Sequence, residues 1–306
     1  ASTHCPLRAC GGQPAEPLNQ QAPTLYAPSQ FNWADTMSTH IAFIGGGNMA
    51  RSLIGGLVRE GQPRNAIHVA EPNADLRAAL AQDFGVVTHS QNAAAALVAG
   101  TWVLAVKPQV MGSVLDELAP VAADRAPLVV SIAAGVTHAR IARSLGARAR
   151  VVRTMPNTPA MIGAGITGLY AGADVAMDER AKVERLLATA GATVWIEDEQ
   201  LMDAVTAVSG SGPAYFFLLI EALTAAGTRQ GLPEATASKL ALHTALGAAR
   251  MAVESGEPAA TQRQRVTSPG GTTAAALDAF ARGGFAELVD TAVDAATRRG
   301  RELAGA

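Results

Sequence analysis

The chain has 306 residues, enough for two domains, and 49% of them are hydrophobic against 16% charged. This composition favours a folded protein with a sizeable core, and the formal net charge of −2 implies no basic face for nucleic acid. Both cysteines, Cys5 and Cys10, lie near the start, so a disulfide framework, a thiolate metal site and a cysteine nucleophile are excluded from the rest, which suits the reducing cytoplasm.

Residues 1–36 differ in composition from the residues that follow. They are rich in Pro, Gln and Ala, show no periodicity and contain no apolar stretch of the length found in secretory signals. Met37 stands directly before the first strand pattern, so we interpret residues 1–36 as a disordered leader or extension, with a transit peptide as the weaker alternative. No later apolar run reaches the roughly 18 residues needed to cross a bilayer, so no membrane partner is expected.

From residue 39 short apolar runs alternate with segments of helical periodicity. Strands are predicted at Thr39–Ile44, Ala66–Glu71, Thr101–Val106, Leu128–Ile132 and Arg150–Met155, with edge strands at Ile166–Tyr170 and Ala192–Ile196. Helices are predicted between them, among them 49–58, Ala74–Phe84 and Asp178–Ala190. This alternation predicts an α/β domain over residues 37–200, with a parallel sheet and helices on both faces.

After about residue 200 the strand pattern stops. Helices are predicted at Leu201–Ser209, Ala214–Gly231, Pro233–Gly256, Thr272–Ala281 and Phe285–Ala304, and Gly and Pro residues separate them. Residues 201–306 therefore form a second, all-helical domain. Because this domain is Ala-rich and thin, we expect a second copy of the chain to stabilise it.

A glycine motif joins the first predicted strand to the first helix. It consists of Gly45, Gly46, Gly47, Asn48, Met49 and Ala50, and it fits the pattern G-x-G-x-x-A. The first glycine permits a tight turn, the second lets the backbone approach a pyrophosphate, and the small last residue lets helix and strand pack closely. A flexible structural turn is the alternative, but the order of strand, glycines, helix and strand favours a Rossmann dinucleotide-binding domain.

Charged residues near the predicted strand ends bear on the choice of cofactor. Glu71 ends the second strand, where an acid accepts hydrogen bonds from ribose and favours NADH over NADPH. Arg77, one helical turn later, is placed to meet a 2′-phosphate instead, and a solvated strand end is the third interpretation of Glu71. Lys107, with Pro108, ends the strand Thr101–Val106; contact with a cofactor and simple solvation are equal alternatives for it.

Three turn motifs mark the expected substrate side. Met155–Pro159 is a rigid turn that carries Asn157 at the edge of the sheet. Ser209–Tyr215 and Val266–Thr273 are rich in glycine and hydroxyl residues and precede apolar helices, so their N–H groups form nests that suit a carboxylate. Simple helix capping is the alternative for both.

Groups that donate or accept protons are scarce. After residue 37 the only lysines are Lys107, Lys182 and Lys239, none of the five histidines is paired with an acid in a recognisable relay, and no metal-binding spacing occurs. We interpret these histidines as structural or exposed. Reducing a carbonyl requires a positioned proton donor, whereas a protonated imine requires none because hydride addition leaves a neutral amine. The sequence therefore favours imine reduction.

In their order along the chain, these motifs resemble those of the pyrroline-5-carboxylate reductase family. The resemblance covers about residues 38–303 and rests on Ile41–Ala50, Ala105–Pro108, Ser131–Val136, Met155–Pro159, Ser209–Tyr215 and Ser268–Thr273. It implies reduction of L-1-pyrroline-5-carboxylate, a cyclic imino acid, to L-proline with NADPH or NADH, the last step of proline biosynthesis. It also implies a homodimer, often assembled into decamers.

The resemblance implies roles for individual residues. The substrate-binding residues are Ser268, Gly270, Gly271, Thr272 and Thr273, with Thr273 as the catalytic residue whose hydroxyl lies near the ring nitrogen. The cofactor-binding residues are Gly45 to Ala50, Glu71, Asn92, Val106, Lys107, Pro108, Ala133, Ala134 and Asn157. Family members that favour NADPH tend to carry a small hydroxyl residue in place of Glu71, so the preference between the two cofactors stays open.

Two other functions account for part of the sequence. A β-hydroxyacid dehydrogenase shares a Rossmann domain followed by helices, but it needs a lysine on the first long helix of the second domain, and 214–231 has none. A regulatory protein that binds a dinucleotide without catalysis would need a partner module, for which the sequence gives no sign.

Overall fold

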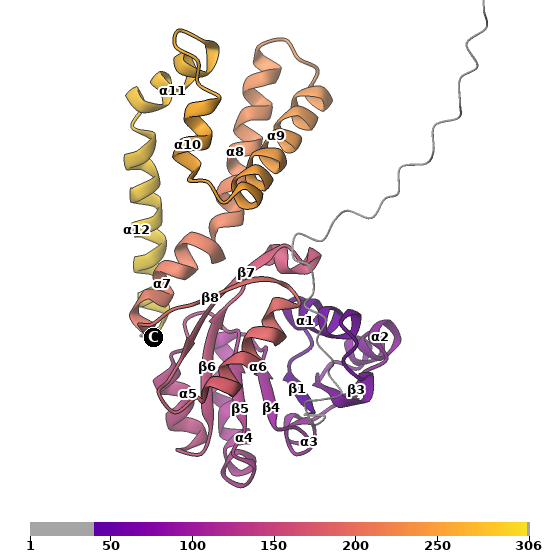
Figure 1. Cartoon of the computed structure of the whole chain (residues 1–306). Helices are drawn as coiled ribbons and strands as arrows, with labels where there is room; N and C mark the ends of the chain where they lie inside the picture. The colour runs from indigo at the N-terminus through magenta and orange to yellow at the C-terminus, as the bar shows by residue number, and fades with distance from the viewer. Residues whose placement is uncertain (1–39, 305–306) are drawn as a thin grey trace, which may run out of the picture.

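The computed structural model describes residues 40–304 and divides them into two parts (Figure 1). A sheet covered by helices on both faces forms the first part. A group of helices forms the second, and it extends away from the sheet on the side of its last strands. The predicted leader 1–36, with Cys5, Cys10 and Met37, lies outside the described residues.

The first part is built on one eight-stranded sheet. Its strands are β1 Ile41–Ile44, β2 Ile67–Ala70, β3 Val87–His89, β4 Thr101–Leu104, β5 Leu128–Ser131, β6 Arg150–Met155, β7 Gly165–Ala171 and β8 Gly191–Trp195, in the order β3-β2-β1-β4-β5-β6-β7-β8. Strands β1 to β6 are parallel, as predicted, because a helix between each pair returns the chain to the same edge. The short strand β3 was not predicted, because its residues are at least partly exposed and lack an apolar pattern.

The predicted edge position of β7 is wrong, because this strand lies between β6 and β8, and it runs antiparallel to β6. The connection between Met155 and Gly165 contains only a short 3₁₀ helix, Thr158–Ile162, whereas a parallel crossover needs a dozen or more residues. The chain therefore turns back beside β6. After helix α6, Met177–Ala188, strand β8 pairs parallel with β7.

Two apolar layers, one on each face of the sheet, hold the first part together. The helices are α1 Asn48–Arg59, α2 Ala74–Phe84 and α6 on one face, and α3 Asn92–Ala96, α4 Met111–Arg125 and α5 His138–Leu145 on the other. Successive strand residues alternate between the layers, so that Phe43 packs in the first layer and Ile44 in the second, both fully buried. Each such side chain contributes about 1.5–3 kcal/mol to folding.

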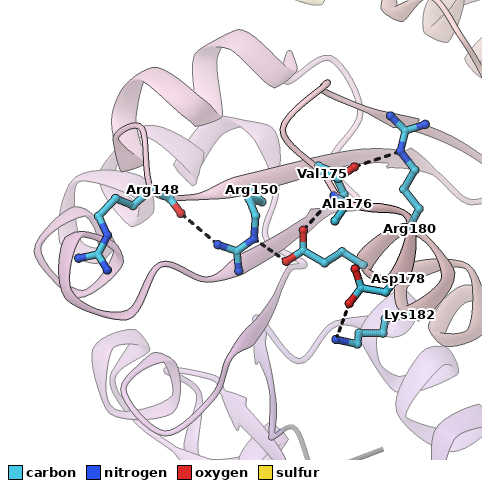
Figure 2. Close-up of polar contacts among 8 residues, drawn as sticks. Arg148, Arg150, Val175, Ala176, Asp178, Arg180 and Lys182 are labelled. Carbon is cyan, nitrogen blue, oxygen red and sulfur yellow. Dashed lines mark hydrogen bonds and ion pairs between the residues drawn. The ribbon is translucent and has the colours of Figure 1, made fainter.

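Polar contacts tie the start of β6 to the start of α6 (Figure 2). The Glu179 carboxylate accepts a hydrogen bond from Nε of Arg150 and another from the backbone N–H of Ala176, at 3.1 Å. Arg180 donates from Nε to the carbonyl oxygen of Val175 at 3.4 Å. Because the Arg150 and Glu179 side chains keep part of their surface in water, these contacts orient α6 more than they stabilise the fold.

The second part contains only helices among the described residues. They are α7 Met202–Val205, α8 Gly212–Arg229, α9 Glu234–Ser255, α10 Ala259–Arg265, α11 Thr272–Arg282 and α12 Phe285–Ala304. Helix α10 was not predicted, because it is short and largely polar. The predicted break between Leu201–Ser209 and Ala214–Gly231 is wrong, because a π-helix, Thr206–Gly210, joins α7 directly to α8.

The helical part leaves many large apolar side chains exposed. Phe216 and Phe217 on α8 and Leu288 on α12 are 64%, 60% and 65% exposed. One helical stretch, Glu199–Arg229, is long and apolar enough, by length and composition alone, to cross a membrane, although charged residues interrupt it. Large exposed apolar patches mark interaction surfaces. The single chain therefore lacks a cover for these helices, which agrees with the expectation that a second copy stabilises them.

Three histidines form a hydrogen-bonded row across the neighbouring strands: His40 directly before β1, His68 in β2 and His89 in β3. Nδ1 of His40 lies 2.7 Å from Nε2 of His68, and Nδ1 of His68 lies 3.0 Å from Nε2 of His89. Burial lowers the pKa of His68, which the neighbouring His40 and His89 lower further, and burial also lowers the pKa of His89. The lowered pKa values of His68 and His89 favour their neutral rings, in which one nitrogen donates and the other accepts. These histidines are therefore structural, as the sequence predicted.

The histidine row should make folding stability depend on pH. Because the folded-state pKa values of His68 and His89 lie below the ordinary value of about 6.5, the unfolded chain binds more protons in acid, and stability should fall as the pH drops through about 6.5. His68→Gln should weaken this dependence, whereas His243→Gln, at an exposed position of α9, should leave it unchanged. Urea unfolding at about pH 7.5 and about pH 5.5, at fixed protein concentration, measures the effect. The same pH dependence in His68→Gln and the wild type would contradict this account.

Candidate active site

The glycine motif forms a tight turn at the carboxyl end of β1. Gly45 donates from its N–H to the carbonyl oxygen of Ala70 at 2.8 Å and has a φ of +104°, in the left-handed region that favours glycine. A Cβ at this position would lie 2.6 Å from the carbonyl oxygen of Ala105. At Gly47 a Cβ would meet nothing within 4 Å. The turn is therefore closed at Gly45 and open at Gly47, as predicted for a site that a pyrophosphate approaches.

Helix α1 begins directly at this turn without a side-chain cap. Gly47 is the N-cap residue, and no side chain accepts a hydrogen bond from the first turn of the helix. Asn48 is exposed and Met49 half-buried, whereas Ala50 is fully buried between helix and sheet, as predicted for the small residue of the motif. The N–H groups of the first turn and the positive end of the helix dipole are thus available to an anion.

Glu71 lies against the glycine turn. Its Oε2 accepts a hydrogen bond from the N–H of Gly46 at 3.0 Å, and its Oε1 accepts one from the N–H of Asn73 at 3.0 Å. Nη1 of Arg77 donates to the carbonyl oxygens of Glu71 and Pro72, both at 2.8 Å. The structure thus brings both predicted determinants of cofactor choice to one place, with a carboxylate fixed at the turn and a guanidinium beside it.

A second carboxylate lies at the start of α3. Nδ2 of Asn92 donates to Oε2 of Glu117 at 2.8 Å, and the N–H of Ala93 donates to Oε1 of Glu117 at 3.4 Å. Glu117, which the sequence analysis did not single out, therefore orients the side chain of Asn92. Nothing in the sequence pattern of α4 indicated this role, because Glu117 occupies an ordinary exposed helix position.

The remaining predicted cofactor contacts lie at the carboxyl edge of the sheet. Val106 is half-buried, while Lys107 and Pro108 are exposed after β4; after β5, Ala133 is buried and Ala134 exposed. The structure brings these two loops together because β4 and β5 are neighbours. Gly135, next in the second loop, has a φ of +72°, and a Cβ there would lie 3.6 Å from Leu303 of α12. The last helix of the chain therefore returns to this edge.

Asn157 is buried at the junction of the two parts, and both the nitrogen and the oxygen of its side-chain amide form hydrogen bonds. Its Nδ2 donates to the carbonyl oxygen of Ser209 at 3.1 Å, and its Oδ1 accepts from the N–H of Ile166 at 3.0 Å. Contact between this amide and a cofactor would require one of these bonds to break, so its assignment to cofactor binding stays a prediction.

The interpretation of Ser209–Tyr215 as a nest at a helix start is wrong. Residues 206–210 form a π-helix within a continuous helical stretch, so the N–H of Ser211 donates to the carbonyl oxygen of Thr206 at 2.8 Å. The N–H of Ala214 likewise donates to the carbonyl oxygen of Ser211 at 3.0 Å. These amides are therefore engaged within the helix. A Gly-Ser-Gly-Pro pattern predicts a loop, and packing against the sheet overrides this preference.

The turn at residues 268–273, in contrast, opens a helix as predicted. Gly270 has a φ of +71°, the N–H of Gly271 donates to the carbonyl oxygen of Ser268 at 3.0 Å, and Gly271 is the N-cap of α11 with no side-chain cap. Thr272 is exposed and Thr273 half-buried in the first helical turn. This turn presents N–H and hydroxyl groups to an anion, as the turn before α1 does.

The two uncapped turns do not meet within one chain. Figure 1 shows α11 at the outer end of the helical part, away from α1 and β1. Among residues 40–304, no group of three His, Cys, Asp or Glu side chains is arranged to hold a metal ion. The site thus consists of two separate sets of backbone amides and hydroxyls.

Two protein-family descriptions match the two parts of this chain. Residues 199–303 match "Pyrroline-5-carboxylate reductase dimerisation", and residues 40–135 match "NADP oxidoreductase coenzyme F420-dependent". The first match begins between β8 and α7, so it coincides with the helical part of the structure.

Proteins with a similar sequence or structure cover nearly the same length. The pyrroline-5-carboxylate reductase of Pseudomonas aeruginosa is 51% identical over 269 residues, which cover 88% of this chain and 98% of that protein. The Synechocystis enzyme of the same name is 45% identical, covering 87% and 99%. The structure of a pyrroline-5-carboxylate reductase from Coxiella burnetii has a TM-score of 0.84 at 42% identity, covering 87% and 99%. A Plasmodium falciparum pyrroline carboxylate reductase with NADP bound has a TM-score of 0.76 at 28% identity, covering 87% and 98%.

Two glycines of the first turn should respond differently to substitution. Gly47→Ala should fold normally, because its backbone angles are open to any residue, yet it should weaken NADH binding about tenfold by filling the space next to the phosphates. Gly45→Ala should instead destabilise the fold by about 2 kcal/mol or more, from a left-handed φ and a clash with Ala105. Thermal denaturation and fluorescence titration with NADH measure the two effects. Wild-type NADH affinity in Gly47→Ala would place the phosphates elsewhere.

Proposed function

The chain belongs to the pyrroline-5-carboxylate reductase family and reduces pyrroline-5-carboxylate to proline with NADH or NADPH; from that premise we propose which residues carry the reaction and how two copies build one active site. The protein is thus an oxidoreductase of proline biosynthesis. The observation that carries the proposal is that α1 and α11, one in each part of the chain, both start at a glycine N-cap that follows a left-handed glycine and has no side-chain cap.

We place the dinucleotide along the carboxyl edge of the sheet. Its pyrophosphate would bind the N–H groups of Gly47 to Ala50, where α1 has no cap of its own. Gly45 and Gly46, whose N–H groups donate to Ala70 and Glu71, would shape the turn around it. Its adenosine would lie beside Glu71 and Asn92, and its nicotinamide beside the loops that hold Val106 to Pro108 and Ala133 to Ala134. This placement is supported by the neighbouring positions of β1, β2, β4 and β5 in the sheet.

We place the substrate carboxylate on the turn before α11. The N–H groups of Thr272 and Thr273, with the hydroxyl of Ser268, would surround one carboxylate. Gly270 supplies the left-handed bend that aims them at it, and the Gly271 N–H closes the turn on Ser268. The same chemistry at both turns explains why the enzyme needs few charged residues: each turn recognises a negative group through backbone amides.

Because the two turns lie apart in one chain, we propose that the active site is shared between two protomers. The chain forms homo-oligomers, and its helical part matches a dimerisation domain. The exposed apolar faces of α8 and α12 would pack against a partner, which would bring the turn of one protomer to the nicotinamide of the other. Assembly of such dimers into a decamer, a cytoplasmic location, and the absence of membrane and nucleic-acid partners are further parts of this proposal.

Catalysis would depend mainly on positioning. A dihydronicotinamide held beside these loops would supply the hydride for the carbon of the C=N bond. Thr273, in the first turn of α11, would hold the ring nitrogen through its hydroxyl, and the amides before it would fix the carboxylate, so that the ring presents one face. The substrate enters as the protonated imine and leaves as the amine, so no residue of the chain needs to transfer a proton in this step.

Thr273→Ala should lower kcat by about tenfold to a hundredfold, because the hydroxyl that orients the imine nitrogen is lost. NADH affinity should stay at the wild-type level, since Thr273 lies outside the cofactor domain. Thr273→Ser, which keeps a hydroxyl, serves as the matched control and should retain most of the activity. Steady-state kinetics with the pyrroline substrate, together with NADH titration, measures both quantities. Wild-type kcat in Thr273→Ala would show that Thr273 has another role.

We also propose that Glu71 gives the enzyme a preference for NADH. Its carboxylate is fixed at the glycine turn and would repel a 2′-phosphate. Glu71→Ser should therefore shift the ratio of kcat/KM for NADPH to kcat/KM for NADH towards NADPH by about tenfold, which is equivalent to about 1.4 kcal/mol. Asp75→Ser, one charge removed at the exposed start of α2, is the control. An unchanged ratio in Glu71→Ser would contradict the assignment.

A further inference from the structure

The turn Met155–Pro159 is joined to the helical part through one buried side chain. Asn157 is 9% exposed, and its amide bridges the π-helix Thr206–Gly210, through the carbonyl oxygen of Ser209, and β7, through the N–H of Ile166. One end of the amide therefore joins two motifs that are far apart in the sequence, and the other end fixes the turn to β7.

The π-helix depends on side chains to satisfy its carbonyl groups. A π-turn bonds each N–H to the carbonyl five residues earlier, as Ser211 does to Thr206, so the regular pattern of the helix is interrupted. Two of its carbonyls are bonded by side chains from outside the turn: the hydroxyl of Tyr215 donates to Ala207 at 3.0 Å, and Asn157 donates to Ser209 at 3.1 Å. Of these two donors, only Asn157 belongs to the cofactor domain.

Close packing surrounds this hydrogen bond. A Cβ on Gly210 would lie 2.6 Å from Cε of Met155, and a Cβ on Gly168 would lie 2.6 Å from Cγ1 of Val205. The π-helix thus lies directly against the carboxyl end of β6, and the last residue of α7 lies against β7. At the start of the same helical stretch, the buried Arg153 contacts Glu199 at 3.0 Å and Asp203 at 3.8 Å. The stretch is therefore fixed at one end by charge and at the π-helix by Asn157.

A small tilt at the π-helix becomes a larger displacement at the far end of α8. This helix has 18 residues and spans about 27 Å, so a tilt of about 5° at its start moves its far end by about 2 Å. Displacements of about 1 Å at a reacting centre reduce rates by about a hundredfold. A single hydrogen bond at the pivot is therefore placed to affect the rate through geometry alone.

We propose that Asn157 is a positioning residue: it sets the angle between the cofactor domain and the helical part, and through it the approach of the substrate turn to the nicotinamide. It does not bind the cofactor. The inference rests on the proposed placement of the substrate at residues 268–273.

Two substitutions in the full-length homo-oligomer separate this role from the alternatives. Asn157→Asp keeps an acceptor for the N–H of Ile166 but removes the donor to Ser209, whereas Asn157→Leu removes both. Asn65→Asp, which makes the same change at an exposed position, is the control. The measurements are NADH affinity by fluorescence titration, and kcat/KM for the pyrroline substrate from about pH 8 to about pH 6, each relative to the wild type at the same pH.

The proposal expects both Asn157 variants to bind NADH within about twofold of the wild type, and kcat/KM for the imine to fall by about tenfold or more. The deficit of Asn157→Asp should shrink as the pH falls, because the protonated carboxyl group regains an O–H that donates to Ser209; Asn157→Leu and Asn65→Asp should show no such recovery. An NADH affinity that weakens in proportion to kcat/KM would make Asn157 a cofactor ligand and overturn the proposal.

Wild-type kcat/KM in Asn157→Asp at about pH 8 would also overturn it. If Asn157→Leu does not fold, Asn157→Asp decides alone, because it preserves the bond within the cofactor domain. Wild-type activity in Thr273→Ala would instead refute the substrate turn, and it would leave the NADH affinity and the pH dependence of Asn157→Asp unaffected.

Discussion

Backbone N–H groups at the start of a helix need an acceptor, and this enzyme leaves them without a side-chain cap at two decisive places. Helices α1 and α11 each begin at a glycine N-cap, and no side chain satisfies their first turn. In both cases a neighbouring glycine in the left-handed region, Gly45 or Gly270, bends the chain before the helix. Cofactor and substrate both carry negative groups of the kind that such turns bind, so under the proposed placement a site with few acids, bases and lysines would suffice for imine reduction.

The second constraint on the proposed active site is that a single chain supplies only half of it. Its helical part exposes large side chains of α8 and α12 and carries the substrate turn at its outer end, whereas the cofactor turn lies at the sheet. In the proposed arrangement, the apolar surface that a second copy would cover also determines which two turns meet. Contacts at Asn157 and Arg153 join the two parts of each chain, and oligomerisation would convert the angle between them into a distance between reactants.

Much of this architecture could be predicted from the sequence, because local patterns determine it. The five buried parallel strands, the turn before α1 and the turn before α11 follow from apolar runs and from glycines with a steric reason to be there. The antiparallel direction of β7 could not be predicted with the same certainty, since it depends on a short connection. The π-helix, the histidine row and the role of Glu117 depend on contacts between distant segments, which leave no periodic signal. Asn157 was singled out by its motif, but only the three-dimensional structure gives its partners.

The most direct test of a shared active site is complementation in mixed dimers. A Gly47→Ala subunit has a damaged cofactor turn and an intact substrate turn, and a Thr273→Ala subunit has the reverse. If each site combines the cofactor turn of one protomer with the substrate turn of its partner, co-refolding the two impaired variants should restore about half of the wild-type activity per mixed dimer at an NADH concentration well below KM, because one of the two sites is then built from intact halves. Activity no higher than that of the two variants measured separately would show that each chain builds its site alone, and it would contradict the account.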